Sequence, residues 1–307
     1  MKISKNIAYA LMALAAILWS TSGTFTVLAL NEGAGVMQIT VFSYVFGAAV
    51  LVPAIAFFDP KSLRIDLKDF WPMLIFSLIT GTFFSLAWYF CVQKTGVATA
   101  VILLYGYPSI VTVASVFLLK EKLSPQKALA LPLTFMGAVL VAGAQDFGEG
   151  LTFDTVGIAL GIFSAIAGAI YYLWGKKFLD KYSATTVILY MTVLSIPGVV
   201  ILANPIDIFS HALPGVSWLW ILLLGIFPGT IGFVISMFAL GHIEASKASI
   251  VASIEPVSAV MIAFIVLSEK INFIQAIGVV AVFVGVLLLR ITRRNGKEKP
   301  QEVVLDR

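Results

Sequence analysis

Hydrophobic residues occur in ten long runs along the chain, and short polar segments rich in turn-forming residues separate them. A helix that crosses a lipid bilayer needs about 20 apolar residues, and each run is close to that length. The polar segments between the runs, such as NEGAG and KEKLSP, are short. None of them is long enough to form a water-soluble domain. The pattern therefore predicts ten transmembrane helices, at residues 7–29, 36–58, 70–93, 97–119, 125–143, 156–178, 184–203, 217–241, 247–267 and 273–291.

Composition supports an all-α membrane protein. Of the 307 residues, 60% are hydrophobic and 12% are charged, and the mean hydropathy is +1.01, whereas soluble domains are about half apolar and a quarter charged. Much of the apolar surface of the protein must therefore face lipid. The single Cys91 excludes an internal disulfide and a thiolate metal cluster, and with only two histidines the chain lacks the ligands of a typical membrane haem. We expect no cofactor and no metal.

The positive charges predict an orientation in the membrane. Lys and Arg concentrate in the cytoplasmic loops of membrane proteins. With a cytoplasmic N-terminus, all 20 Lys and Arg residues except Lys94 and Lys270 lie on the cytoplasmic side. We therefore expect a multi-pass protein of the cell membrane (plasma or inner), with both termini and a basic tail at 293–307 in the cytoplasm. The sequence pI near 9.1 then indicates membrane orientation and no nucleic-acid partner.

The two halves of the chain resemble each other at a constant offset of 148 residues. The pairs that match at this offset include Gly81-Thr82 with Gly229-Thr230, Pro108 with Pro256, Glu121-Lys122 with Glu269-Lys270, and Gly137 with Gly285. Each half holds five helices, so the second must enter the membrane from the opposite side. The prediction is two inverted five-helix repeats, at 1–143 and 144–292. Inverted repeats are typical of transporters that work by alternating access.

These residues also resemble a known family. The segment ILWSTSG at 17–23, Pro108 with the following LLKEK, and EPVSAV with the later LSEK at 255–270 are similar to motifs of the ten-helix EamA-type members of the drug/metabolite transporter superfamily. The resemblance covers about 10–142 and 157–290. Many members carry an Arg near the start of their second helix, and this chain has none there. The role that this Arg has in those family members is therefore not assigned to any residue of this chain.

Repeats and resemblance together indicate transport and not catalysis. We expect a secondary transporter or exporter of a small organic metabolite, such as an amino acid or a drug-like solute, with protons as a candidate coupling ion. An uncoupled facilitator or exchanger is the alternative. A membrane enzyme or sensor has less support, because the chain carries none of the common catalytic motifs. The expected partners are the solute and the lipid bilayer. Whether the protein forms a homodimer is left open.

Glu255 is the first candidate for a functional residue. It lies eight residues beyond Lys247, about 12 Å into its helix at 1.5 Å per residue. An ionised carboxylate facing lipid there costs about 2.5–3.5 kcal/mol, so it is expected to face protein or a cavity. It either carries a proton or contacts substrate, or it is an acid held by neighbouring donors with a packing role. Pro108 and Pro256 interrupt helical hydrogen bonding and are either paired hinges or static kinks.

Deep aromatic and hydroxyl side chains are the other candidates. Buried tyrosine and tryptophan side chains need a polar partner, and we expect them to line a central cavity where the fourth and ninth helices cross near Tyr107 and Glu255. Ordinary packing is the alternative for the aromatic candidates, and hydrogen bonding to their own helix is the alternative for the hydroxyls. Gly23 is expected to admit another backbone. The candidates are Tyr107, Tyr105, Trp19, Tyr44, Tyr171, Ser20, Thr24 and, nearer the outer mouth, Trp88.

Charged residues near the helix ends are expected at the membrane surface. Glu121 precedes Lys122 at the end of the fourth helix, and Glu244 lies in the loop before the ninth. The simplest interpretation of Glu121 is an interfacial pair with Lys122, and Glu244 is expected to be solvated. A gating role for Glu121 and Glu269 at the two mouths is the alternative.

Overall fold

The computed structural model describes residues 3–143, 154–202, 208, 212–213, 215–266 and 272–289. Within these ranges the chain forms helices and no strands, which confirms the all-α prediction. Nine helical spans are long and apolar enough to cross a membrane, and a shorter apolar helix follows them. The predicted basic tail 293–307 lies outside the described residues.

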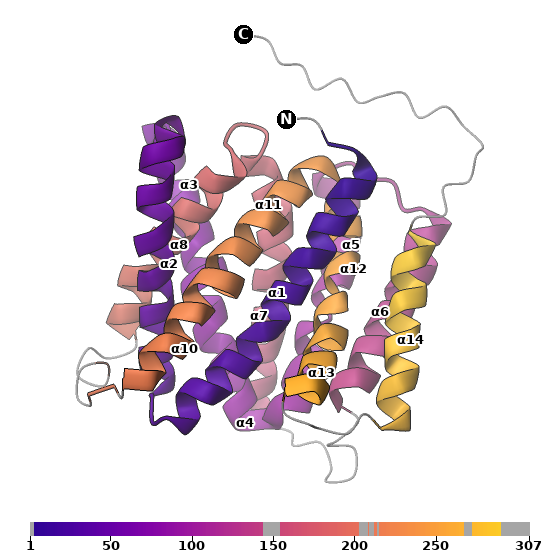
Figure 1. Cartoon of the computed structure of the whole chain (residues 1–307). Coiled ribbons are helices and arrows are strands. Elements are labelled where there is room, and N and C mark those ends of the chain that lie inside the picture. Colours follow the sequence, from indigo (N-terminus) through magenta and orange to yellow (C-terminus); the bar gives the residue numbers. More distant parts are fainter. Residues whose placement is uncertain are drawn as a thin grey trace.

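The helix bounds agree closely with the hydrophobic runs. Figure 1 shows the helices side by side, with the start of α1 and the end of α14 at the same edge. The first part of the bundle consists of α1 (Lys5–Asn31), α2 (Val36–Phe58), η1 (Pro60–Leu63), α3 (Leu67–Ser77), η2 (Leu78–Phe83), α4 (Phe84–Leu104), α5 (Tyr107–Leu118) and α6 (Pro125–Gly143). The second consists of α7 (Thr155–Phe178), α8 (Ala184–Leu202), α10 (Gly215–Ile226), η4 (Phe227–Gly232), α11 (Phe233–His242), α12 (Ala245–Ala252), α13 (Ile254–Val266) and α14 (Phe273–Leu288).

Several spans combine more than one of these elements. The third runs from α3 through the π-helical η2 into α4 and ends at Gly96, whose φ of 77° breaks the helix. The fourth contains the end of α4 and α5. The eighth and ninth are α10–η4–α11 and α12–α13.

The interruptions fall at matching places in the two parts. The fourth span breaks at Tyr105 and Gly106, and the ninth breaks at Ser253, 148 residues after Tyr105. Both breaks directly precede the turn that contains Pro108 or Pro256, where a proline is tolerated because the first-turn N–H groups have no helical partner. The interruption of helical hydrogen bonding predicted from Pro256 is found where α12 ends at Ala252. The π-helical segments η2 and η4 contain the matched Gly-Thr pairs.

Packing contacts recur when the two parts are exchanged. Helix α1 packs on α11 and on α12–α13, and α7 packs on α4 and on α5 in the same way. Helix α2 contacts α10, and α8 contacts α3. Three further pairs join equivalent parts of the chain to each other: α2 contacts α8, α6 contacts α14, and α5 of the fourth span contacts α12 of the equivalent ninth span.

Glycines set the closest helix contacts. An added Cβ at Gly157 or Gly161 would lie 2.5 Å from a side chain of α4, so these glycines allow α7 and α4 to approach closely. At Gly225 it would lie 2.5 Å from the Ser43 carbonyl oxygen of α2. The expectation for Gly23 is wrong: it is exposed, and nothing lies within 4 Å of an added Cβ. A glycine in an apolar run is therefore not by itself a sign of close packing.

Candidate functional site

The two helix breaks bring Glu255 to an aromatic cluster in the middle of the bundle. Tyr105 caps the end of α4, and Glu255 lies in the first turn of α13. The Tyr105 hydroxyl lies next to the Glu255 carboxyl group, to which it can donate a hydrogen bond. Tyr105 is 5% exposed, and Glu255 is half-buried. The carboxyl group therefore faces protein and not lipid.

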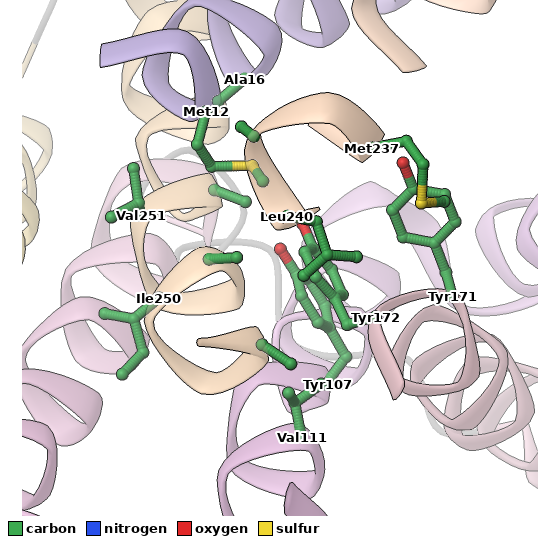
Figure 2. Packing of buried hydrophobic residues seen from close by; sticks show 14 of the residues in the cluster. Met12, Ala16, Tyr107, Val111, Tyr171, Tyr172, Met237, Leu240, Ile250 and Val251 are labelled. Carbon is green, nitrogen blue, oxygen red and sulfur yellow. The ribbon is translucent and has the colours of Figure 1, made fainter. Parts of the chain in front are cut away.

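Tyr107 connects this pair to the second half of the chain. Its ring stacks on Tyr172 of α7, with centroids 5.6 Å apart and an interplanar angle of 5°. Its hydroxyl donates to the Ser249 carbonyl oxygen of α12 at 3.5 Å. Tyr107 and Tyr172 lie together beneath Leu240 (Figure 2). The fourth, sixth and ninth spans thus meet at Tyr107, as expected.

Tyr172 was missed by the sequence analysis. Its side chain is 3% exposed, and its hydroxyl is buried without a hydrogen-bond partner of standard geometry. A buried hydroxyl in this state is destabilising. The only sequence signal was its position beside Tyr171, which was selected instead.

Trp19 and Tyr171 form the neighbouring part of the cluster. Their rings lie edge to face at 6.3 Å, and both contact Phe233 of α11. The Tyr171 hydroxyl donates to Ser236 Oγ at 3.2 Å, whereas the Trp19 Nε1 is buried without a partner. Phe233 and Ser236 were also missed by the sequence analysis. The sequence signal that could have found them is their position shortly after the matched pair Gly229-Thr230.

The other sequence candidates lie elsewhere or have local partners. Tyr44 hydrogen bonds to Ser85 at 3.0 Å, between α2 and α4. Ser20 donates to the Ile17 carbonyl oxygen of its own helix at 2.6 Å, which favours the alternative of a local hydrogen bond. Thr24 and Trp88 are half-buried, and no contact ties either to Glu255.

Two apolar hollows, of about 180 and 460 Å³, are lined by residues of α1 with α12–α14 and by residues around Ser183 and Phe238. Glu255 lines neither. Among the described residues, no group of three or more His, Cys, Asp or Glu side chains is placed to hold a metal ion. That the cluster opens into a transport cavity stays a prediction.

Known proteins resemble the chain over nearly its whole length. A transporter of Archaeoglobus fulgidus described as uncharacterized is 29% identical over 87% of this chain and 91% of its own. An uncharacterized inner membrane transporter of Salmonella typhimurium, YicL, is 23% identical over 92% of this chain and 94% of its own. A crystal structure at 19% identity covers 93% of this chain and 97% of its own with a TM-score of 0.80, which supports the fold.

A family match agrees with these relatives. The model of the EamA-like transporter family matches residues 6–143 and 155–291. With nine spans and a further apolar helix among the described residues, the chain is a multi-pass membrane protein. It belongs to the EamA-like transporter family.

Proposed function

We propose that the protein is a secondary transporter or exporter that moves a small organic metabolite across the cell membrane by alternating access. Glu255 exchanges a proton during the cycle or pairs with a cationic group of the solute. The observation that carries this proposal is the contact of Tyr105 with Glu255 at two matched helix breaks, beside the stacked Tyr107 and Tyr172.

Two inverted repeats, 1–143 and 144–292, are the basis for alternating access. The proposal is supported by family matches that begin at residues 6 and 155, by helix breaks 148 residues apart, and by packing contacts that recur when the halves are exchanged. Such repeats can exchange conformations about a site near the middle of the membrane. Tyr107 and Glu255 occupy equivalent positions at that site, so the site itself is asymmetric.

Aromatic side chains suit an organic solute better than a bare ion. Their faces attract cations and pack against apolar groups, and Glu255 adds a negative charge when ionised. The unpartnered Tyr172 hydroxyl and Trp19 Nε1 supply hydrogen-bond donors. Pro108 and Pro256, which follow the breaks, are the proposed hinges.

The solute can be sought by ligand-induced thermal stabilisation of the purified protein. Amino acids, nucleosides, sugars and cationic drugs form the panel, because a ligand that binds only the folded state raises the melting temperature. A hit is then tested for movement into proteoliposomes with and without a pH gradient. Transport that ignores the gradient supports the uncoupled facilitator or exchanger. A hit that binds but never moves would argue for a sensor.

Single cysteines will test the orientation. In a Cys91→Ser background, cysteines at the exposed Asn31 and at Lys94 should react with a membrane-impermeant maleimide added to intact cells, whereas cysteines at Lys61, Ser124 and Ser183 should not. The reason is that alternate loops lie on opposite faces and the positively charged loops are cytoplasmic. After cell disruption all five should react. Labelling of the second group in intact cells would contradict cytoplasmic termini.

A further inference from the structure

A buried charge cluster joins the two halves of the chain at the face where α1 begins. It consists of Glu121, Lys127, Glu244 and Lys247 together with the first residues of α12, and we refer to it as the latch. Glu121 and Lys127 come from the turn after α5 and from α6. Glu244 lies in the connection between α11 and α12, and Lys247 lies in the first turn of α12. The expected pairing of Glu121 with Lys122 is wrong, because Glu121 contacts Lys127 and α12 instead.

Glu121 covers the N-terminus of α12. Its carboxylate accepts hydrogen bonds from the backbone N–H of Ala245 at 2.6 Å and of Ser246 at 3.3 Å, and a short one from the Ser246 hydroxyl. Its side chain is 7% exposed. A carboxylate at this place satisfies first-turn N–H groups and interacts favourably with the helix dipole. The contact therefore ties the end of the fourth span to the start of the ninth.

Lys127 neutralises two carboxylates in the same cluster. Its Nζ lies 3.2 Å from Glu121 Oε2 and 2.7 Å from Glu244 Oε2, and its side chain is 2% exposed. Lys247 adds a contact to Glu244 at 3.3 Å. Burial raises the pKa of Glu244, but Lys127 and Lys247 outweigh it and lower that pKa below its usual value. Glu244 is therefore an ion-paired side chain, contrary to the expectation that it is solvated.

Helices α5 and α12 connect the latch to the candidate site. The two anchor points of the latch are the end of α5 and the start of α12, and the hydrogen bond from Tyr107 to Ser249 joins the same two helices at the site end. Access to Glu255 from this face requires α5 and α12 to separate. Separation breaks the Glu121 contacts and leaves Lys127 without part of its charge compensation.

A second contact between the halves lies at the same face. Lys181 binds both Asp66 and Asp69, and Tyr182 donates to Asp69 at 2.5 Å. At the opposite face, the ion pair between the halves in the described chain is Lys94 with Asp154, at 3.9 Å and with both side chains 40% exposed. An exposed pair at that distance contributes little. Among the described residues, the charged connections between the halves are therefore stronger at the face where α1 begins.

The sequence does not repeat the latch in the second half. At the offset of 148, Gln275 stands where Lys127 stands, and Ala98 stands where Ser246 stands. Gln275 accepts a hydrogen bond from the Asn272 N–H and donates to the Val141 carbonyl oxygen at 3.4 Å. The counterpart of Glu121, Glu269, lies outside the described residues. The positions equivalent to the latch at the opposite mouth thus lack both its buried cation and its hydroxyl donor.

We propose that the latch is the gate that closes the face where α1 begins. We further propose that the replacement of Lys127 and Ser246 by Gln275 and Ala98 at the equivalent positions of the opposite mouth biases the resting protein toward closure at this face. This inference rests on the alternating-access cycle of the proposed function. Glu121 holds the gate, and Lys127 is the buried counter-ion that makes opening costly. The gate is separate from Glu255, so the two can be tested independently.

Distance measurement across the latch will test the gate. Spin labels are attached to cysteines at the exposed positions Lys122 and Gly241, in a Cys91→Ser background, and the distance distribution is measured by pulsed electron resonance. With the latch intact, one short distance should dominate. Glu121→Gln keeps the shape and removes the charge, so it should raise the ratio of open to closed populations at least about tenfold, because removing one partner of a buried ion pair is strongly destabilising. Ser246→Ala should shift the ratio in the same direction by less.

The matched control is Asp154→Asn, which removes an exposed ion pair at the opposite face and should leave the distribution unchanged. Folding of each variant is checked by gel filtration and by its melting temperature. If folded Glu121→Gln and Ser246→Ala both keep the wild-type distribution, the latch is not a gate. The measurement needs no solute, so a failure of Glu255 to couple transport would leave this result unaffected.

Discussion

Replacing Glu255 with glutamine is expected to abolish solute movement driven by a pH gradient, or to remove transport of cationic solutes selectively, while expression and folding persist. Glutamine keeps the size of the side chain and can still accept a hydrogen bond from Tyr105. It cannot bind or release a proton, and it carries no negative charge to pair with a cation. The measurement is the initial rate in proteoliposomes over a series of imposed pH gradients, with the solute found by thermal stabilisation.

Two variants sharpen this test. Glu32→Gln changes an exposed carboxylate at the end of α1 and should transport like the wild type. Tyr105→Phe removes the donor to Glu255, so it should shift the pH profile and keep gradient-driven transport. Loss of the pH response with retained solute exchange would assign the proton to Glu255 and binding to other groups. Wild-type rates with an unchanged pH profile in Glu255→Gln would show that the glutamate is structural.

The spans were predictable from the sequence because a lipid bilayer imposes a length on every apolar helix. The second helix was predicted at 36–58 and is found at Val36–Phe58, and the sixth was predicted at 156–178 and is found at Thr155–Phe178. Backbone groups in lipid must be satisfied within the helix, so apolar length and helix length nearly coincide. The constant offset between Pro108 and Pro256 likewise indicated where both helices break.

Side-chain partners were less predictable, because they depend on which helix faces lie together in three dimensions. Glu255 and Tyr105 were selected for their depth, and they are in contact. Depth alone also selected Tyr44, which hydrogen bonds to Ser85 in another part of the bundle. The latch was misread for the same reason, because the partner of Glu121 was sought next to it in sequence and lies 124 residues away at Ala245.

The largest loss of stability is expected from a substitution at the close contact, or seam, between α6 and α14. A Cβ added at Gly278 would lie 2.7 Å from the Gly137 carbonyl oxygen, 2.8 Å from Val141 Cγ2 and 2.9 Å from Leu140 Cβ. Backbone at such a distance cannot move away without separating the two helices. Close approach at small residues is how helices associate in membranes, where the hydrophobic effect between helices is absent.

Gly278→Ala is therefore expected to destabilise the protein by about 1–3 kcal/mol, the usual range for an overpacked contact, and to lower its melting temperature. Gly23→Ala is the matched control, because Gly23 also lies within a helix but an added Cβ meets nothing within 4 Å. Alanine is favoured over glycine inside a helix by about 0.8–1.0 kcal/mol, so this control should be neutral or slightly stabilised. Both are measured as thermal unfolding in detergent at one scan rate, since membrane proteins commonly unfold irreversibly. Equal melting temperatures for the two variants would contradict a tight seam between α6 and α14.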